Sequence, residues 1–119
     1  MLLNLSNHPS SKWSHQQKDA AIKQFGGVLD MPFPMIDPNA TLEEVQSLAE
    51  ETFEAINDLQ LSDLSVHVMG EFTFCYAFLK LLEQQGIDAY ASTTKREVRI
   101  DESGIKTSVF LFFKFRPYY

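Results

Sequence analysis

The fold is decided by residues 65–86, which read SVHVMGEFTFCYAFLKLLEQQG. A short apolar run precedes a glycine, and a segment that is hydrophobic on nearly every side follows it. The run predicts a buried strand over Ser65–Met69, and the later segment predicts a helix that begins after Gly70 and ends at Gly86. A strand that leads directly into a helix is typical of an α/β sheet. It places the helix N-terminus at the carboxyl edge of the sheet, where such folds hold anionic ligands.

The N-terminal part of the chain predicts two more strands and a helix. The apolar run Leu2–Ser6 reads as the first strand. Val28–Phe33 reads as the second, and Pro32 places it toward an edge of the sheet, because proline cannot donate a ladder hydrogen bond. Between these strands, Ser14 starts a capping-box pattern, so we expect a helix from His15 to about Phe25.

The clearest amphipathic helix follows a second capping box, formed by Thr41 and Glu44. Its apolar residues recur mostly at steps of three and four from Leu42 to Leu59. The acidic side chains lie mostly away from this stripe, and we interpret them as a solvated face. These acids are Glu43, Glu44, Glu50, Glu51 and Glu54.

The pattern changes in the last third of the chain. Ile87–Ser92 reads as a fourth strand, and the alternation of Val98 and Ile100 with charged residues reads as a fifth. A turn at Asp101–Gly104 reverses the chain into Ile105–Phe115, so we expect an antiparallel hairpin instead of another crossover helix. Residues 109–113 are apolar without alternation, which predicts a strand covered on both faces.

Together these elements predict one Rossmann-like α/β domain over residues 1–119. We expect a three-layer sandwich with four parallel strands in the order 2-1-3-4 and a C-terminal antiparallel hairpin. The last strand of the chain should lie next to the fourth, with its alternating partner outside it. This order places the topological switch between the first and third strands, whose outgoing helices leave on opposite faces of the sheet.

Composition limits the classes of function. The net charge is −6, so the surface as a whole should repel nucleic acid, and we expect no binding to duplex DNA. The one cysteine, Cys75, lies in the most apolar helix, which indicates a buried thiol in a reducing compartment. The first apolar residues form too short a run for a signal peptide, and no window approaches a membrane span. We therefore expect a cytoplasmic protein with no membrane partner.

The motifs of the common enzyme classes are missing. The sequence has no G-x-G-x-x-G, Walker A loop, C-x-x-C or H-E-x-x-H, so dinucleotide binding, NTP hydrolysis and structural zinc lose their support. It also lacks the G-x-S-x-G of many Ser-His-Asp hydrolases. We predict no cofactor and no metal. His67 lies within a strand, where we interpret it as a core or half-buried histidine.

The predicted topology brings three polar loops to the carboxyl edge of the sheet: residues 7–13, 70–73 and 92–96. Helix amides, hydroxyls and cations in these loops suit a phosphate or a sugar. His8 follows the first strand directly, where its imidazole could serve as a general acid–base catalyst. The donors are the backbone amides of the Gly70 turn and of the start of the helix at Glu71, the hydroxyls of Ser10, Ser11, Thr73, Ser92, Thr93 and Thr94, and the cations Lys12, Lys95 and Arg96.

Each of these residues also has a purely structural interpretation. Glu71 is a carboxylate in a first helical turn, where it answers the helix dipole by itself. Lys95 and Arg96 are equally compatible with a solvated loop. The serines and threonines are residues that often cap helices and turn the backbone. These alternatives stay open at the level of the sequence.

Several segments resemble the small CRISPR-associated Rossmann-fold (CARF-like) proteins. The similar segments are the strand and polar loop LLNLSNHPSS, the glycine-marked exit VMGEFTF and the Ser-Thr-Thr segment after the fourth strand. The resemblance implies binding of cyclic oligoadenylate second messengers at the carboxyl edge of a dimeric sheet, and some small members cleave them. It implies that the ligand loops contain Asn7, His8, Pro9, Ser10 and Ser11 after the first strand and Gly70, Glu71 and Thr73 after the third. Thr93, Thr94 and Arg96 match more loosely.

The resemblance therefore implies a homodimeric protein of antiviral defence that binds cyclic oligoadenylate and is either a metal-independent ring nuclease or a ligand sponge. Many family members carry a winged-helix or nuclease domain, which this sequence lacks, so removal or sequestration of the ligand is expected instead of a regulated effector role. The alternative is a small non-enzymatic α/β interaction module whose polar loops only cap helices.

Overall fold

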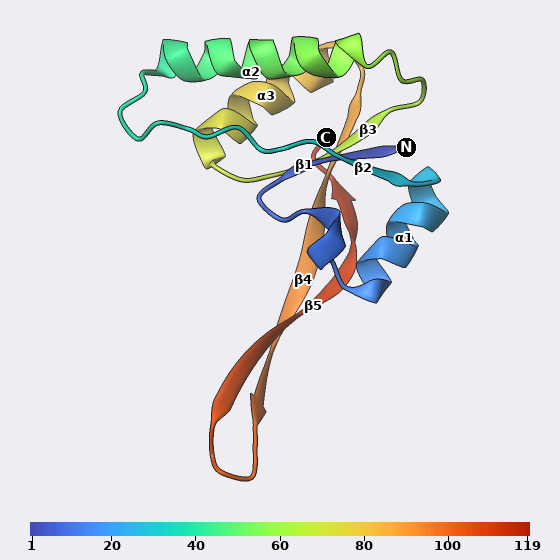
Figure 1. Cartoon of the computed structure of the whole chain (residues 1–119), viewed down its shortest axis with the longest axis vertical. Coiled ribbons are helices and arrows are strands. Elements are labelled where there is room, and N and C mark those ends of the chain that lie inside the picture. Colours follow the sequence, from blue (N-terminus) through green and yellow to red (C-terminus); the bar gives the residue numbers. More distant parts are fainter.

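A five-stranded mixed sheet forms the centre of the computed structural model, which describes residues 1–119 (Figure 1). The strand order is β2-β1-β3-β4-β5, with β5 antiparallel to β4 and the other pairs parallel. The predicted order 2-1-3-4 and the antiparallel C-terminal pair are confirmed, whereas the Rossmann-like label stays a prediction. The strands are β1 (Leu2–Ser6), β2 (Val28–Asp30), β3 (Ser65–Met69), β4 (Asp88–Ile100) and β5 (Lys106–Pro117).

Helices cover both faces of the sheet. In Figure 1, α2 and α3 lie together on one side and α1 lies on the other, which gives the predicted three layers. None of these helices combines the length and apolar character that crossing a membrane requires. The helices are α1 (His15–Phe25), α2 (Leu42–Asp58) and α3 (Phe72–Gln84), and a 3-10 turn, η1 (Ser10–Lys12), precedes α1.

Local signals fix where the helices begin. The Ser14 hydroxyl accepts a hydrogen bond from the Gln17 amide at the start of α1. At the start of α2, Thr41 and Glu44 form the reciprocal capping box that the sequence predicts. Gly26 ends α1 with φ of 85°, a left-handed conformation that glycine adopts without strain.

The side chains of β1 and β3 are apolar on one face of the sheet and mostly polar on the other. Leu3 and Leu5 pair in register with Val66 and Val68, and all four are fully buried in the main core beneath α2 and α3. Because side chains alternate along a strand, the intervening residues face α1. These include Asn4, Ser6 and His67, the three buried polar residues of the chain. Buried polar side chains on the α1 side need hydrogen-bond partners, and this need shapes the candidate site.

The C-terminal hairpin differs from the prediction. The predicted fourth and fifth strands are one continuous strand, β4, and β5 pairs with it from Tyr90↔Pro117 to Ile100↔Lys106. The predicted outer position of a separate fifth strand is therefore wrong. The polar residues 93–96 read as a loop in the sequence, but a strand exposed on both faces tolerates them. At the opposite edge, β2 is shorter than predicted and ends at Asp30, before Pro32.

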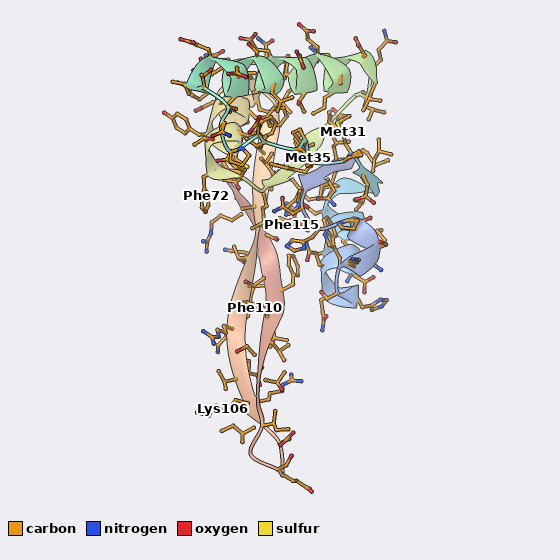
Figure 2. The ribbon with its side chains drawn as sticks, turned by 60° about the vertical axis from the view of Figure 1, so that its left-hand side comes forward. Met31, Met35, Phe72, Lys106, Phe110 and Phe115 are labelled. Atoms are coloured by element: carbon orange, nitrogen blue, oxygen red, sulfur yellow. The ribbon has the colours of Figure 1, made fainter.

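Beyond a β-bulge between Thr93 and Thr94, β4 and β5 leave the body of the protein as a two-stranded arm. We call residues 94–114 the arm. Figure 2 shows Phe115 at the base of the arm near α1, Phe110 farther out and Lys106 near the tip. The expectation that residues 109–113 are covered on both faces is wrong, because Phe110 and Phe113 are each 64% exposed. No helix extends along this part of the hairpin.

The base of the arm is anchored by aromatic packing. The Phe115 ring lies 5.6 Å from that of Phe25, 5.0 Å from that of Phe112 and 6.0 Å from that of Trp13. We predict that Phe115→Ala lowers the free energy of unfolding by about 3 kcal/mol or more, because the side chain is buried. The matched control Phe113→Ala should cost less than about 1 kcal/mol. Urea denaturation measures both values, and equal losses would contradict the packing described here.

Candidate functional site

A pocket of about 410 Å³ opens on the α1 side, at the carboxyl ends of β1 and β3 and beside the middle of β4. Its walls come from η1 and the start of α1 on one side and from the base of the arm on the other. Its polar groups include imidazoles, hydroxyls and one amino group, and its apolar walls are largely aromatic. The lining residues are His8, Lys12, Trp13, Ser14, Gln17, His67, Met69, Ser92, Thr94, Phe110 and Phe112.

The buried amide of Asn4 organises the polar groups beside this pocket. Its Nδ2 donates to Asp30 Oδ1 and to the His8 carbonyl oxygen, both at 2.8 Å. Its Oδ1 accepts from Ser6 Oγ at 2.7 Å and lies 2.9 Å from His67 Nδ1. One side chain therefore connects β2, β3 and the loop after β1.

The loop after β1 is held by several hydrogen bonds at once. The His8 carbonyl also accepts from Trp13 Nε1 at 3.1 Å, and Ser6 Oγ lies 3.0 Å from it, so the single Ser6 proton is shared between this carbonyl and Asn4 Oδ1. Asp30 accepts from the Ser10 amide at 3.0 Å and from Ser10 Oγ at 2.7 Å. Burial by itself raises the pKa of Asp30. The hydrogen bonds from Ser10 and Asn4 lower it by more than that, so the pKa lies below its usual value. A charged Asp30 thus holds the start of η1 in place.

His67 has one satisfied nitrogen and one without a partner. Asn4 Oδ1 is an acceptor, because Asn4 Nδ2 donates to two oxygens, so His67 Nδ1 must carry a proton. Burial, with a smaller contribution from the charge of His8, lowers the pKa of His67 to about 4. The ring is then neutral near pH 7, and Nε2 is a bare hydrogen-bond acceptor. Nε2 is buried, has no partner in the protein, and belongs to a residue that lines the pocket.

The N-terminus of α3 is already occupied by a carboxylate of the chain. Glu71 accepts from the Thr73 amide at 3.1 Å and from the Phe74 amide at 2.7 Å. The hydrogen bond from the Thr73 hydroxyl, followed by those from the two amides, lowers the pKa of Glu71. The amides expected to bind a phosphate are thus engaged by Glu71, which agrees with the structural interpretation of this residue.

Gly70 has a packing role. A Cβ atom at this position would lie 2.3 Å from Cζ of Phe33 and 2.7 Å from Oδ1 of Asn7. The close approach of the Phe33 ring therefore requires a glycine here, independently of any ligand.

The structure brings together only part of the predicted site. His8 and Thr94 line the pocket, together with Lys12 and Ser92. Asn7 and Pro9 line a different hollow beside Asp30. Arg96 donates to Ser108 Oγ at 3.0 Å along the arm. The predicted residues that do not line the pocket are Asn7, Pro9, Ser10, Ser11, Gly70, Glu71, Thr73, Thr93, Lys95 and Arg96.

Sequence reasoning missed three features of the site: the roles of Asn4 and Asp30, and the unpartnered nitrogen of His67. A usable signal was present, since Asn4 and His67 are polar residues within apolar strands that were predicted to be neighbours. They are register partners in the structure. No group of three or more His, Cys, Asp or Glu side chains is arranged to hold a metal ion.

The family of the chain is shown by a family model that matches residues 1–116 and so spans the pocket and the arm. The chain belongs to the family described as uncharacterized protein MJ1673 family. That description names no ligand and no reaction. Among curated proteins, none is similar enough to the chain to indicate a relationship. The functional interpretation of this member of the MJ1673 family therefore depends on its own geometry.

We predict the Nδ1–H tautomer for His67, with Nε2 unprotonated, because Asn4 Oδ1 can only accept. Long-range ¹H–¹⁵N NMR distinguishes the two tautomers directly. An Nε2–H tautomer in the parent protein would contradict the assignment of the Asn4 amide.

The low pKa of His67 also predicts a pH dependence of stability. Below pH 6.5 the unfolded chain protonates this imidazole, whereas the folded chain resists protonation down to about pH 4. As the pH is lowered from 6.5 to about 4, the free energy of unfolding of the parent should therefore fall more steeply than that of His67→Gln. The difference should approach about 1.4 kcal/mol per pH unit. Parallel slopes in urea denaturation series would show that His67 is protonated in the folded state.

Proposed function

We propose that this protein binds a cyclic oligoadenylate, with one adenylate unit seated in the pocket over His67. The observation that supports this proposal best is the buried Nε2 of His67, an acceptor without a partner in a residue that lines the pocket. A buried polar atom left unpaired costs about 1–3 kcal/mol, so a ligand that donates to it gains free energy. The adenine amino group and the ribose 2′-hydroxyl are both suitable donors.

The other lining residues suit the remaining parts of a nucleotide. Lys12 supplies a positive charge for a phosphate, and Ser92 and Thr94 supply hydroxyl groups. Phe110 and Phe112 offer aromatic surface on which a base can stack. The choice of an oligoadenylate among nucleotides rests on the resemblance of the chain to CARF-like proteins. The same resemblance is the basis for proposing a cytoplasmic protein of antiviral defence.

The volume of the pocket limits how much of the ring it holds. Ligand pockets commonly measure about 300–1,000 Å³, and this one, at about 410 Å³, is near the lower end. It suits one nucleotide unit and is too small for a ring of several. A ring with internal symmetry would therefore be shared between two copies of the chain, each providing one pocket.

Cleavage of the bound ring would require only the chemistry of the ligand and a positioned imidazole. The ribose 2′-oxygen bonds to the adjacent phosphorus while the bond from that phosphorus to the 5′-oxygen breaks. The 2′-hydroxyl loses its proton and the departing 5′-oxygen gains one. We assign the proton transfer to His8 because it is exposed and lines the pocket. A pocket that aligns the 2′-oxygen would accelerate the step by positioning.

We expect cyclic tri-, tetra- or hexa-adenylate to bind the parent protein in calorimetric titration. Lys12→Ala should weaken binding about tenfold or more, because a charged hydrogen bond contributes about 1.5–3 kcal/mol. Lys23→Ala is the matched control, since Lys23 lies in the last turn of α1 and does not line the pocket. Absence of binding by all three rings would overturn the proposal and favour the interaction module.

Chromatography of the incubated ring separates a ring nuclease from a sponge. Linear products that disappear in His8→Ala, while binding persists, would identify His8 as the catalytic residue. Tight binding without products would identify a sponge. Products that persist in His8→Ala would overturn the role of His8.

A further inference from the structure

The arm has a charge opposite to that of the body. Residues 94–114 contain five Lys or Arg and three Asp or Glu, a net charge of +2. The remaining residues contain five Lys or Arg and thirteen Asp or Glu, a net charge of −8. Of the five arm cations, only Arg99 contacts a carboxylate, that of Glu97. The arm is therefore basic and largely unpaired on an acidic protein.

One face of the arm is both basic and apolar. Register partners share a face, so Arg96 and Phe110 lie on the same side as Val98, Ile100 and Lys106. Val98 is 53% exposed, and Ile100 and Phe110 are each 64% exposed. Glu97, the one acid within the paired part of the arm, lies on the opposite face with Arg99. We call residues 96, 98, 100, 106 and 110 the docking face; Phe110, at its inner end, also lines the pocket over His67.

A groove with complementary properties lies along α2. It has a volume of about 700 Å³ and is bounded by the first half of α2 and by residues 35–41. Its acids are Asp37, Glu43, Glu44 and Glu51, and no Lys, Arg or His lines it. Met35 at its edge is 95% exposed, and Ile36, Val45 and Leu48 supply further apolar surface. The groove thus combines negative charge with apolar surface.

The arm cannot reach this groove within one chain. Figure 1 shows α2 and the tip of the arm at opposite ends of the molecule, whose longest dimension is 51 Å. In Figure 2, Met35 lies below α2 in the upper part of the molecule, while Lys106 lies near the far tip of the arm. A second molecule placed side by side and antiparallel brings each arm to the groove of its partner. Such a pairing is reciprocal and closes as a dimer with twofold symmetry.

We propose that the arm of one copy docks in the α2 groove of a second copy, so that the protein forms a reciprocal dimer. Two physical arguments support this partner. A two-stranded hairpin is marginally stable alone in water, and this one exposes a row of large apolar side chains that a partner would cover. The charges of the docking face and the groove are opposite, which steers the encounter and fixes its register. The proposal does not rest on the binding of any nucleotide.

Charge reversal tests the contact without ligand. An arm variant carries Arg96→Glu and Lys106→Glu, and a groove variant carries Glu43→Lys and Glu51→Lys. We expect light scattering at tens of micromolar to give a dimer for the parent and a monomer for each variant, since like charges in an interface weaken association about a hundredfold or more. Mixing the two variants should restore a dimer, because each reversed arm then meets a reversed groove. Native mass spectrometry should identify the restored species as the heterodimer.

Matched controls locate the effect. Arg99 lies on the opposite face of the arm, and Glu54 lies on α2 outside the groove. The variants Arg99→Glu and Glu54→Lys should therefore both remain dimeric. A monomeric parent, or a dimer that survives both reversals, would overturn the proposal. Single-stranded RNA labelled with a fluorophore gives the competing result: a monomeric parent whose RNA binding is lost in the arm variant would make the arm a nucleic-acid surface. Failure of the cyclic oligoadenylate titrations would leave these measurements unaffected.

Discussion

The amide of Asn4 is the constraint on which the carboxyl edge of the sheet depends. An amide side chain has two donor hydrogens and an acceptor oxygen, and here all of them are used inside the protein. The four partners are Ser6 within β1, Asp30 in β2, His67 in β3 and His8 in the loop after β1. Any shift of one segment would leave a buried polar atom unpaired, which is costly in the interior. The position of His67 in the pocket is therefore a consequence of how three segments are joined.

The accuracy of the sequence predictions depended on how local each signal was. Thr41 and Glu44 start a helix by contacts within one turn, and Leu2–Ser6 and Ser65–Met69 are apolar runs of strand length. Residues 109–113 looked similar to those runs, yet they lie on an exposed arm. Composition indicates that a segment prefers strand geometry, but whether helices cover the strand depends on residues far away in the sequence. For the same reason Asp30 carried no visible signal, since its contact with Asn4 arises only when β1 and β2 lie side by side.

The net charge of −6 conceals a division between two regions of the molecule. Acidic side chains gather on α2, which has six Asp or Glu and no cation, while the cations of the C-terminal hairpin extend away from the body. An averaged charge argues against contact with polyanions, but the field at a surface is set by nearby charges. The basic arm and the pocket at its base must therefore be considered separately from the acidic helical layer.

The order of the strands along the chain has a consequence for folding. β1 lies inside the sheet, between β2 and β3. Its residue Asn4 contacts Asp30, which is 26 residues away in the sequence, and His67, which is 63 residues away. The closing of these loops must precede the gain from pairing, so the parallel centre of the sheet is expected to form late. The hairpin of β4 and β5, in contrast, joins neighbours through the turn at Asp101–Gly104 and can nucleate by itself. The hairpin of β4 and β5, which is peripheral in the native structure, is thus the element best suited to form first. β1 can pair only after distant parts of the chain have come together.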